Sequence, residues 1–363
     1  MTRSVSYYKL RSEVMNGKKK MGTNIKNYQI EMLDVQDADA FIIFYEETGG
    51  DEKLVLVDAG RYSDGEKISN HLRKYYHNKS VDLAIVTHCD EDHFGGFVYL
   101  LENDYPVSRF WMNIPKNHEN CLNKKNNKNL NSVYSTDVDG KTKNLVELLE
   151  SKKNKHFEKF ASEKAVLDFP FFHIIGPTKE YYESLLPQFR FCKKISSEII
   201  EAVKDTSFYS DENFSHALDG AEDDNSAHNK SSIIFTFEPE LEKKYLFMGD
   251  ATREAFDKIS KSLREKYAKD VFWLKVPHHG SDHNLDSEMI SYINPKVAYV
   301  STAKIDKYLS IGTVNALSQI RCKLYSTHKK HCNFLHHGFD GRIGYSVAEP
   351  FNQKQLEKLN DRN

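Results

Sequence analysis

The chain has 363 residues, of which 39% are hydrophobic, so it can bury the core of one large domain or two modest ones. Its 51 basic and 53 acidic residues give a formal net charge of −2. The chain therefore lacks the large net positive charge that binds nucleic acid nonspecifically. The five cysteines include no CxxC pair, which favours a reducing compartment. Because we find neither the apolar stretch of a secretory signal nor a run near the ~20 residues of a membrane span, we expect a cytoplasmic protein without membrane contact.

The first predicted elements form a hairpin and a βαβ unit. Residues 1–27 are interpreted as an N-terminal extension, and residues 28–45 hold two apolar runs around the turn-forming DVQDADA, which predicts a β-hairpin. A strand over residues 53–60 ends in Asp58, which is either the cap of the following loop or the support of a site. An amphipathic helix over residues 66–76 and a buried strand over residues 81–87 follow.

The strand at residues 81–87 leads into THCDEDHFGG, which gathers four metal-ligand side chains, namely His88, Asp90, Asp92 and His93. Side chains two positions apart point the same way in an extended backbone, so His88, Asp90 and Asp92 are expected to converge while His93 turns away. One loop could then serve two metal ions. Two glycines allow a close backbone approach, and the apolar pattern from Phe97 predicts a short helix.

The string T-H-x-D-x-D-H-x-G-G, which begins at Thr87, resembles the signature loop of the metallo-β-lactamase fold hydrolases. More narrowly, it resembles the soluble hydrolase domain of the DNA-uptake protein ComEC, a branch that carries aspartate at the position of Asp90. The resemblance implies an α/β (α+β) fold, a four-layer αββα sandwich. It would form a single domain over residues 28–347 with a large insertion at about 113–229, followed by a tail at 348–363. It also implies that Asp58, Thr87 and Ser281 support the ligands through hydrogen bonds.

Two later strand ends extend the resemblance. Asp250 follows Gly249 after an apolar strand, and by position alone it could be the N-cap of a helix predicted over residues 251–267. The resemblance makes it instead the carboxylate that bridges two metals. Residues 271–284 contain P-H-H-G-S, a string characteristic of the ComEC-type branch. Either His278 or His279 can be a ligand, and we favour His278 because it leaves the strand directly, which leaves His279 for substrate contact or proton transfer.

Other segments carry weaker signals. Residues 113–160 are polar and lysine-rich, which predicts a solvated insertion or, alternatively, a basic rim that draws in a phosphate backbone. The acidic residues 205–224 predict a solvated loop or a lid. A partial family match at AHNKSS brings His228 and Asn229 toward the substrate side, where Lys275 is a further candidate. A last edge strand is expected at 341–347, and the cysteines and histidines of residues 322–337 have spacings that fit no standard zinc finger.

The predicted mechanism uses two divalent metal ions, Zn²⁺ or Mn²⁺, that activate a bridging water. One ion is held by His88 and Asp90 and the other by Asp92 and His278, with His93 in one of the two shells and Asp250 as the bridge. Asp92, Asp250 and His279 are then the catalytic residues.

The ComEC resemblance suggests a phosphodiesterase or nuclease that acts on DNA or another nucleic acid, with protein partners in a larger system such as anti-phage defence left open. Two alternatives remain. One is a hydrolase of a small ester, lactone or phosphocholine ester. The other is a scaffold that has kept its metals for stability.

Overall fold

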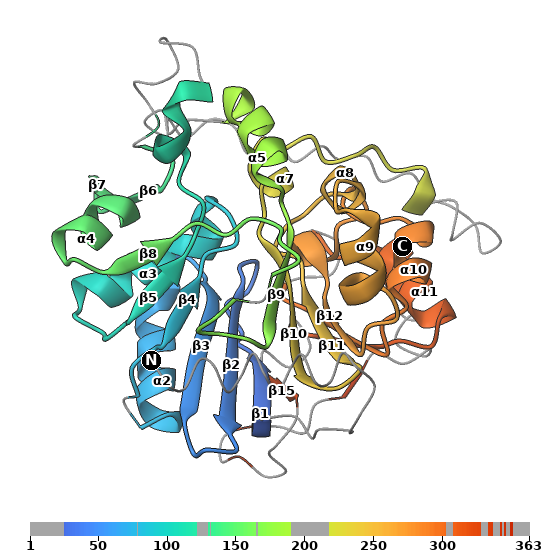
Figure 1. The fold of residues 1–363 in the computed structure, drawn as a ribbon, viewed down its shortest axis with the longest axis horizontal. Coiled ribbons are helices and arrows are strands. Elements are labelled where there is room, and N and C mark those ends of the chain that lie inside the picture. The colour runs from blue at the N-terminus through green and yellow to red at the C-terminus, as the bar shows by residue number, and fades with distance from the viewer. Residues whose placement is uncertain are drawn as a thin grey trace.

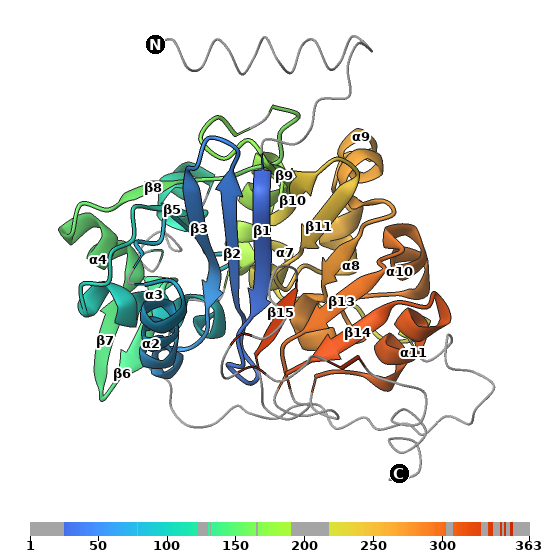
Figure 2. The same ribbon diagram turned by 90° about the horizontal axis from the view of Figure 1, so that it is seen from below.

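The computed structural model describes residues 25–77, 79–121, 130, 132–164, 166–189, 218–302, 308–327, 333–336, 342, 345, 349 and 350. Two β-sheets pack face to face, and helices cover their outer faces (Figures 1 and 2). This arrangement confirms the four-layer αββα sandwich expected from the sequence.

Among the described residues, the first sheet has the strand order β15-β1-β2-β3-β4-β5-β8. Strands β1 and β2 pair antiparallel with Ile30 opposite Ile43, so the predicted hairpin is confirmed. From β3 to β8 the strands run parallel, so their carboxyl ends meet at one edge of the sheet. The strands are β1 (Ile25–Met32), β2 (Ala40–Glu47), β3 (Glu52–Ala59), β4 (Leu83–Ile85), β5 (Arg109–Trp111), β8 (Lys155–Phe157) and β15 (Phe334–His336).

The second sheet has the order β14-β13-β12-β11-β10-β9 in the described part of the chain. Strands β9, β10 and β11 pair antiparallel, whereas β11 to β14 run parallel. The carboxyl ends of β11 and β12 therefore also share an edge. The strands are β9 (Phe172–Gly176), β10 (Ile234–Glu240), β11 (Lys243–Phe247), β12 (Trp273–Lys275), β13 (Val297–Val300) and β14 (Lys323–Ser326).

Three apolar cores hold the four layers together. Between the sheets the core is aromatic, with Phe41 in edge-to-face contact with Phe247 and Trp273. On the outer face of the first sheet, a second core packs α2 (Gly65–Tyr75), α3 (Glu91–Glu102) and α4 (Leu145–Ser151). A third core on the outer face of the second sheet holds α8 (Arg253–Asp257), α9 (Lys261–Leu263), α10 (Ser287–Ile293) and α11 (Ile311–Gln319).

Much of the segment expected as a solvated insertion is part of the fold. Within residues 113–160, strand β8 forms one edge of the first sheet, and Tyr134, Leu145 and Leu149 are buried in the same core as α3. This part of the chain also contains a 3₁₀ turn at Pro115–Cys121 and the hairpin β6 (Ser135–Val138) and β7 (Lys141–Asn144). After residue 160 come β9, which forms one edge of the second sheet, α5 (Lys179–Leu185), a 3₁₀ turn at Leu186–Gln188 and α7 (Ala227–Lys230). Regularly spaced apolar residues within a lysine-rich stretch explain this burial. Residues 122–129, 131, 165 and 190–217 lie outside the described residues.

Three other predicted features differ in the structure or lie largely outside the described residues. The single helix expected at 251–267 is divided into α8, α9 and a π-helical turn at Arg264–Ala268. Most of the edge strand expected at 341–347 lies outside the described residues, and β15 pairs with β1 instead. In the group of cysteines and histidines near the end, Cys322 is buried in the third core, while His328, His331, Cys332 and His337 lie outside the described residues.

Candidate metal centre

The first motif joins the end of β4 to the start of α3. The helix begins at Glu91, directly after Asp90, rather than near Phe97. His93 is therefore on the first helical turn, fully buried, with its Nε2 atom 3.3 Å from Asp250 Oδ2. The expectation that His93 turns away was wrong, because it assumed an extended backbone through a segment that is helical.

Asp58, at the end of β3, lies beneath this loop. Its carboxylate accepts hydrogen bonds from Thr87 N, Thr87 Oγ1 and His93 Nδ1, each at 2.8 Å. Helix α3 also lies close to the end of β3, since a Cβ atom added at Gly96 would be 1.9 Å from Ala59 O. The glycine therefore permits the approach that brings His93 to Asp58.

Asp250 follows β11 and reaches toward both His93 and the turn after β12. Its Oδ1 atom lies 3.3 Å from Lys275 Nζ and accepts a hydrogen bond from His278 N at 3.2 Å. The cap of α8 is Thr252, whose side chain accepts from Ala255 N, so the reading of Asp250 as a helix cap was wrong. Burial alone would raise the pKa of Asp250, but His93, Lys275 and His278 hold it well below its usual range.

The backbone is left-handed at two successive residues after β12, with φ of 44° at His278 and 54° at His279. The two histidine side chains therefore take different positions. His279 is buried, donates from Nδ1 to Ser301 O at 2.8 Å, and directs Nε2 to within 3.6 Å of Asp92 Oδ2. His278 has a side chain 25% exposed and donates from Nδ1 to Asn284 Oδ1 at 2.8 Å.

Three imidazoles present the same type of atom to the cluster. The Nε2 atoms of His88, His93 and His279 are buried and have no hydrogen-bond partner among the described residues. Their Nδ1 atoms contact the Thr87 hydroxyl at 3.1 Å, the Asp58 carboxylate and the Ser301 carbonyl, respectively. With the proton on Nδ1, a neutral imidazole would offer the lone pair of Nε2 to a metal ion, the form in which histidine binds one.

The surrounding charges also suit a cation. Burial lowers the pKa of His93, but the carboxylates of Asp250, Asp58 and Asp92 outweigh it and raise this pKa well above its usual value. Ligand atoms of His88, His93 and Asp250 lie within 4.8 Å of one another, as do those of Asp92, His93 and His279. Buried, unpaired nitrogen atoms beside several carboxylates fit divalent metal ions.

Residues 37–109 match the family model described as the metallo-beta-lactamase superfamily. The metallo-beta-lactamase match contains the ends of β3 and β4, and therefore Asp58 and the loop with His88 and His93. Members of this superfamily are metal-dependent hydrolases, and the match extends to the superfamily rather than to one branch of it. No match was found among curated proteins. No helix in the described part of the chain is long and apolar enough to cross a membrane.

The remaining predicted site residues surround the cluster. His228, in α7, donates from Nδ1 to Asp90 Oδ1 at 2.5 Å. Burial lowers the pKa of His228, but Cys89 and Asp90 raise it to about 10. Asn229 donates to Asp224 Oδ2 at 2.6 Å, on the side of His278.

Two predicted residues lie in different surroundings from those expected. Lys275 is 2% exposed and paired with Asp39 and Asp250, so its ammonium faces the protein interior rather than the substrate side. The Ser281 hydroxyl accepts from His283 N at 3.2 Å and so ties the turn after the histidine pair.

Sequence reasoning missed four residues at the site. Asp39 closes the β1–β2 turn and pairs with Lys275. Arg61, after β3, has Nη2 3.8 Å from Asp92 Oδ2 and a side chain 37% exposed. Asp224 and Asn284 connect to His278 through hydrogen bonds, although Asp224 was assigned to a solvated acidic loop. Only Asp39, a carboxylate in a turn beside a buried strand, had a recognisable sequence signal.

Proposed function

We propose that the chain is a hydrolase that uses two divalent metal ions to cleave phosphodiester bonds in nucleic acid. The observation that carries this proposal is the convergence of three buried imidazole nitrogens, which have no hydrogen-bond partner among the described residues, with the carboxylates of Asp92 and Asp250. These groups come from the ends of parallel strands in both sheets. A structural cluster would instead pair its polar atoms with one another.

We propose that His88, Asp90 and Asp250 would hold one ion, and that Asp92, His93 and His279 would hold the other. This assignment prefers His279 to His278, since His279 directs its unpaired Nε2 at Asp92 whereas His278 is tied to Asn284. His228 holds the carboxylate of Asp90 in place by a hydrogen bond. The carboxylate-rich set favours Mn²⁺ more than a histidine-only zinc site does.

When bound, divalent ions would supply Lewis acidity and would lower the pKa of a water molecule that attacks phosphorus. The chain itself provides a proton donor and a cation near the cluster. His278 Nε2 lies 3.9 Å from Asp250 Oδ2, on a partly exposed ring. Burial lowers the pKa of His278, but Asp250 and Asp224 raise it to about 9. We assign it as the donor to the leaving oxygen.

A phosphodiester fits the charge at the edge of the cluster. The Arg61 guanidinium lies beside Asp92, is held by a hydrogen bond of 2.7 Å to Asp37 O, and remains partly exposed. A guanidinium fixed in this way can bind a non-bridging phosphate oxygen. Neutral esters and lactones offer it no comparable charge.

The test is cleavage of single- and double-stranded DNA and RNA with Mn²⁺ or Zn²⁺, beside a panel of small esters, lactones and phosphocholine esters. We expect nucleic-acid cleavage that Asp250→Ala abolishes and that the surface variant Asp257→Ala retains, since Asp257 has an exposed side chain. Cleavage of only the small esters would reject the substrate class. Metal binding without any hydrolysis would favour a scaffold.

The ligand assignment has its own test in the histidine pair. His279→Ala should lose bound metal, whereas His278→Ala should keep it and lose about 10²- to 10⁴-fold in turnover, the range for a general acid. The reverse pattern, with metal lost only from His278→Ala, would reject the assignment.

A further inference from the structure

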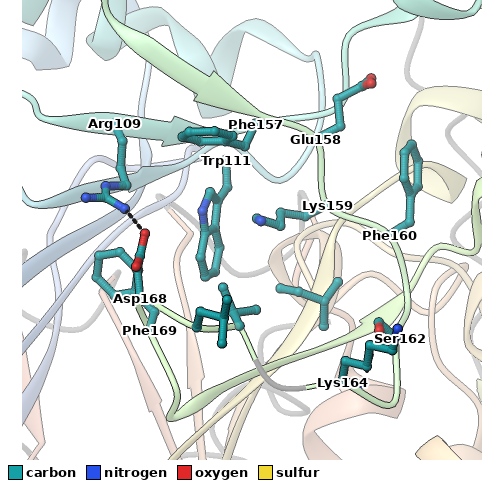
Figure 3. Close-up of a pocket in the computed structure, with 13 residues that line it drawn as sticks. Arg109, Trp111, Phe157, Glu158, Lys159, Phe160, Ser162, Lys164, Asp168 and Phe169 are labelled. Atoms are coloured by element: carbon teal, nitrogen blue, oxygen red, sulfur yellow. Dashed lines mark hydrogen bonds and ion pairs between the residues drawn. The ribbon is translucent and has the colours of Figure 1, made fainter. Parts of the chain in front are cut away.

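A cavity of about 390 Å³ lies between the edge strands β8 and β9, next to β5 (Figure 3). Its volume is within the range of about 300–1,000 Å³ found for small-molecule sites. None of its lining residues belongs to the candidate metal groups. Its wall includes Trp111, whose carbonyl accepts from Val86 N at 2.9 Å, so the cavity adjoins the strand that leads to the metal loop.

The charges that line this cavity leave an excess of cations. Asp168 pairs with Arg109 at 2.5 Å, at the edge of the cavity in Figure 3. Glu158 already accepts a backbone N–H and an imidazole N–H, each at 3.0 Å. Within the described part of the chain, the ammonium groups of Lys159 and Lys164 have no hydrogen bond or ion pair, although the Lys159 ammonium lies over the Trp111 and Phe157 rings. The cavity therefore offers two cations to a ligand.

Lys159 is the more informative of the two lysines. Its ammonium points at Trp111 and lies 4.9 Å from the centre of the tryptophan ring (Figure 3). Burial lowers the pKa of Lys159, although Asp168 acts in the opposite direction. A half-buried ammonium without an ion pair loses hydration that a bound anion would replace.

The rim of the cavity is apolar and exposed. Phe157 is 45% exposed and Leu167 is 67% exposed, and they are two of the three large apolar side chains that are exposed in the described residues. Exposed apolar groups gathered at a cavity mark a binding site more often than scattered ones do. The Phe157 ring next to a cationic group suits a planar, aromatic and negatively charged ligand.

We propose that this cavity is a second binding site that takes a nucleoside monophosphate, with the base against Phe157 and Leu167 and the phosphate on Lys159. The site is separate from the metal centre in its lining residues, so its occupation does not require the hydrolytic activity proposed above. A free mononucleotide, rather than a strand, fits a cavity of this size.

Isothermal titration calorimetry of the full chain with AMP and UMP tests this proposal, with adenosine and inorganic phosphate as separate arms. We expect saturable binding of both nucleotides and weaker binding of either fragment. Lys159→Gln should weaken nucleotide binding about tenfold or more, as expected for the loss of a charged hydrogen bond. Lys155→Gln is the matched control, because Lys155 is exposed on the same strand and does not line the cavity.

Three results would overturn the proposal. One is the absence of saturable nucleotide binding. The second is equal binding by inorganic phosphate, which would remove the role of the base. The third is nucleotide binding that survives Lys159→Gln and Phe157→Ala but is lost in Asp250→Ala, which would move the ligand to the metal centre. Retained binding in Asp250→Ala supports a separate site, whatever the outcome of the hydrolysis assays.

Discussion

Lys275→Met tests the buried charge network behind the metal centre. Lys275 Nζ pairs with Asp39, lies 3.3 Å from Asp250 Oδ1 and donates to Gly249 O at 2.7 Å. Methionine has a similar shape and fits the same space, but it leaves both carboxylates without their cation. Asp39 is fully buried, so its charge cannot recover by hydration.

Removing one partner of a buried ion pair costs about 3–5 kcal/mol, and we expect this loss in the free energy of unfolding of Lys275→Met. The double variant Lys275→Met with Asp39→Asn should recover a large part of this loss, because it removes the buried charge of Asp39 instead of leaving that charge without its cation. Bound divalent metal should also reduce the loss, because it neutralises Asp250.

Urea denaturation of metal-free protein, followed by the fluorescence of Trp111 and Trp273, measures these differences. A loss below about 1 kcal/mol for Lys275→Met, within the range of an exposed ion pair, would refute the argument that this lysine compensates buried carboxylates. A double variant less stable than Lys275→Met would do the same.

Three further predictions follow from single contacts. Asp58→Asn removes the charge that holds the His93 Nδ1 proton, so metal affinity, measured by chelator competition, should fall about 10- to 100-fold, and an unchanged affinity would contradict this role. Gly96→Ala puts a methyl group 1.9 Å from a β3 carbonyl oxygen and should cost at least about 1–3 kcal/mol in urea denaturation. Gly49→Ala has nothing within 4 Å and should change stability by less than about 0.5 kcal/mol, so equal losses in both variants would refute the close contact. Burial raises the pKa of Asp224, but its hydrogen bonds lower it from 3.8 to about 2, which gives stability that is present above pH 3.8 and lost as the pH falls toward 2. Asp224→Asn should remove about 2 kcal/mol of this acid-sensitive stability, and identical acid denaturation profiles would contradict the prediction.

The sequence predicted the main elements because these depend on local apolar patterns, whereas the four-layer fold was implied by the resemblance of the metal-loop motif to a known family. Short β-branched runs that end in polar residues identified the ends of β3, β4, β11 and β12. Parallel strands bring such ends to one edge, which is why residues as distant as His93 and Asp250 come within 3.3 Å.

The details that the sequence left open depend on backbone direction and on distant contacts. The orientation of His93 required knowing that α3 begins at Glu91. The difference between His278 and His279 arises from two successive left-handed residues, a conformation that their sequence does not signal. Asp224 reaches His278 from a stretch whose composition resembles that of a solvated loop.

The central claim is that divalent metal ions occupy the cluster around Asp250 and drive hydrolysis. The most direct measurement is the metal content of protein purified without added metal, by inductively coupled plasma mass spectrometry, for the parent chain and Asp250→Ala. We predict two divalent transition-metal ions per chain in the parent, a clear loss in Asp250→Ala, and hydrolysis that chelation abolishes. A parent chain without bound transition metal, whose hydrolytic activity is unaffected by chelation, would contradict the account.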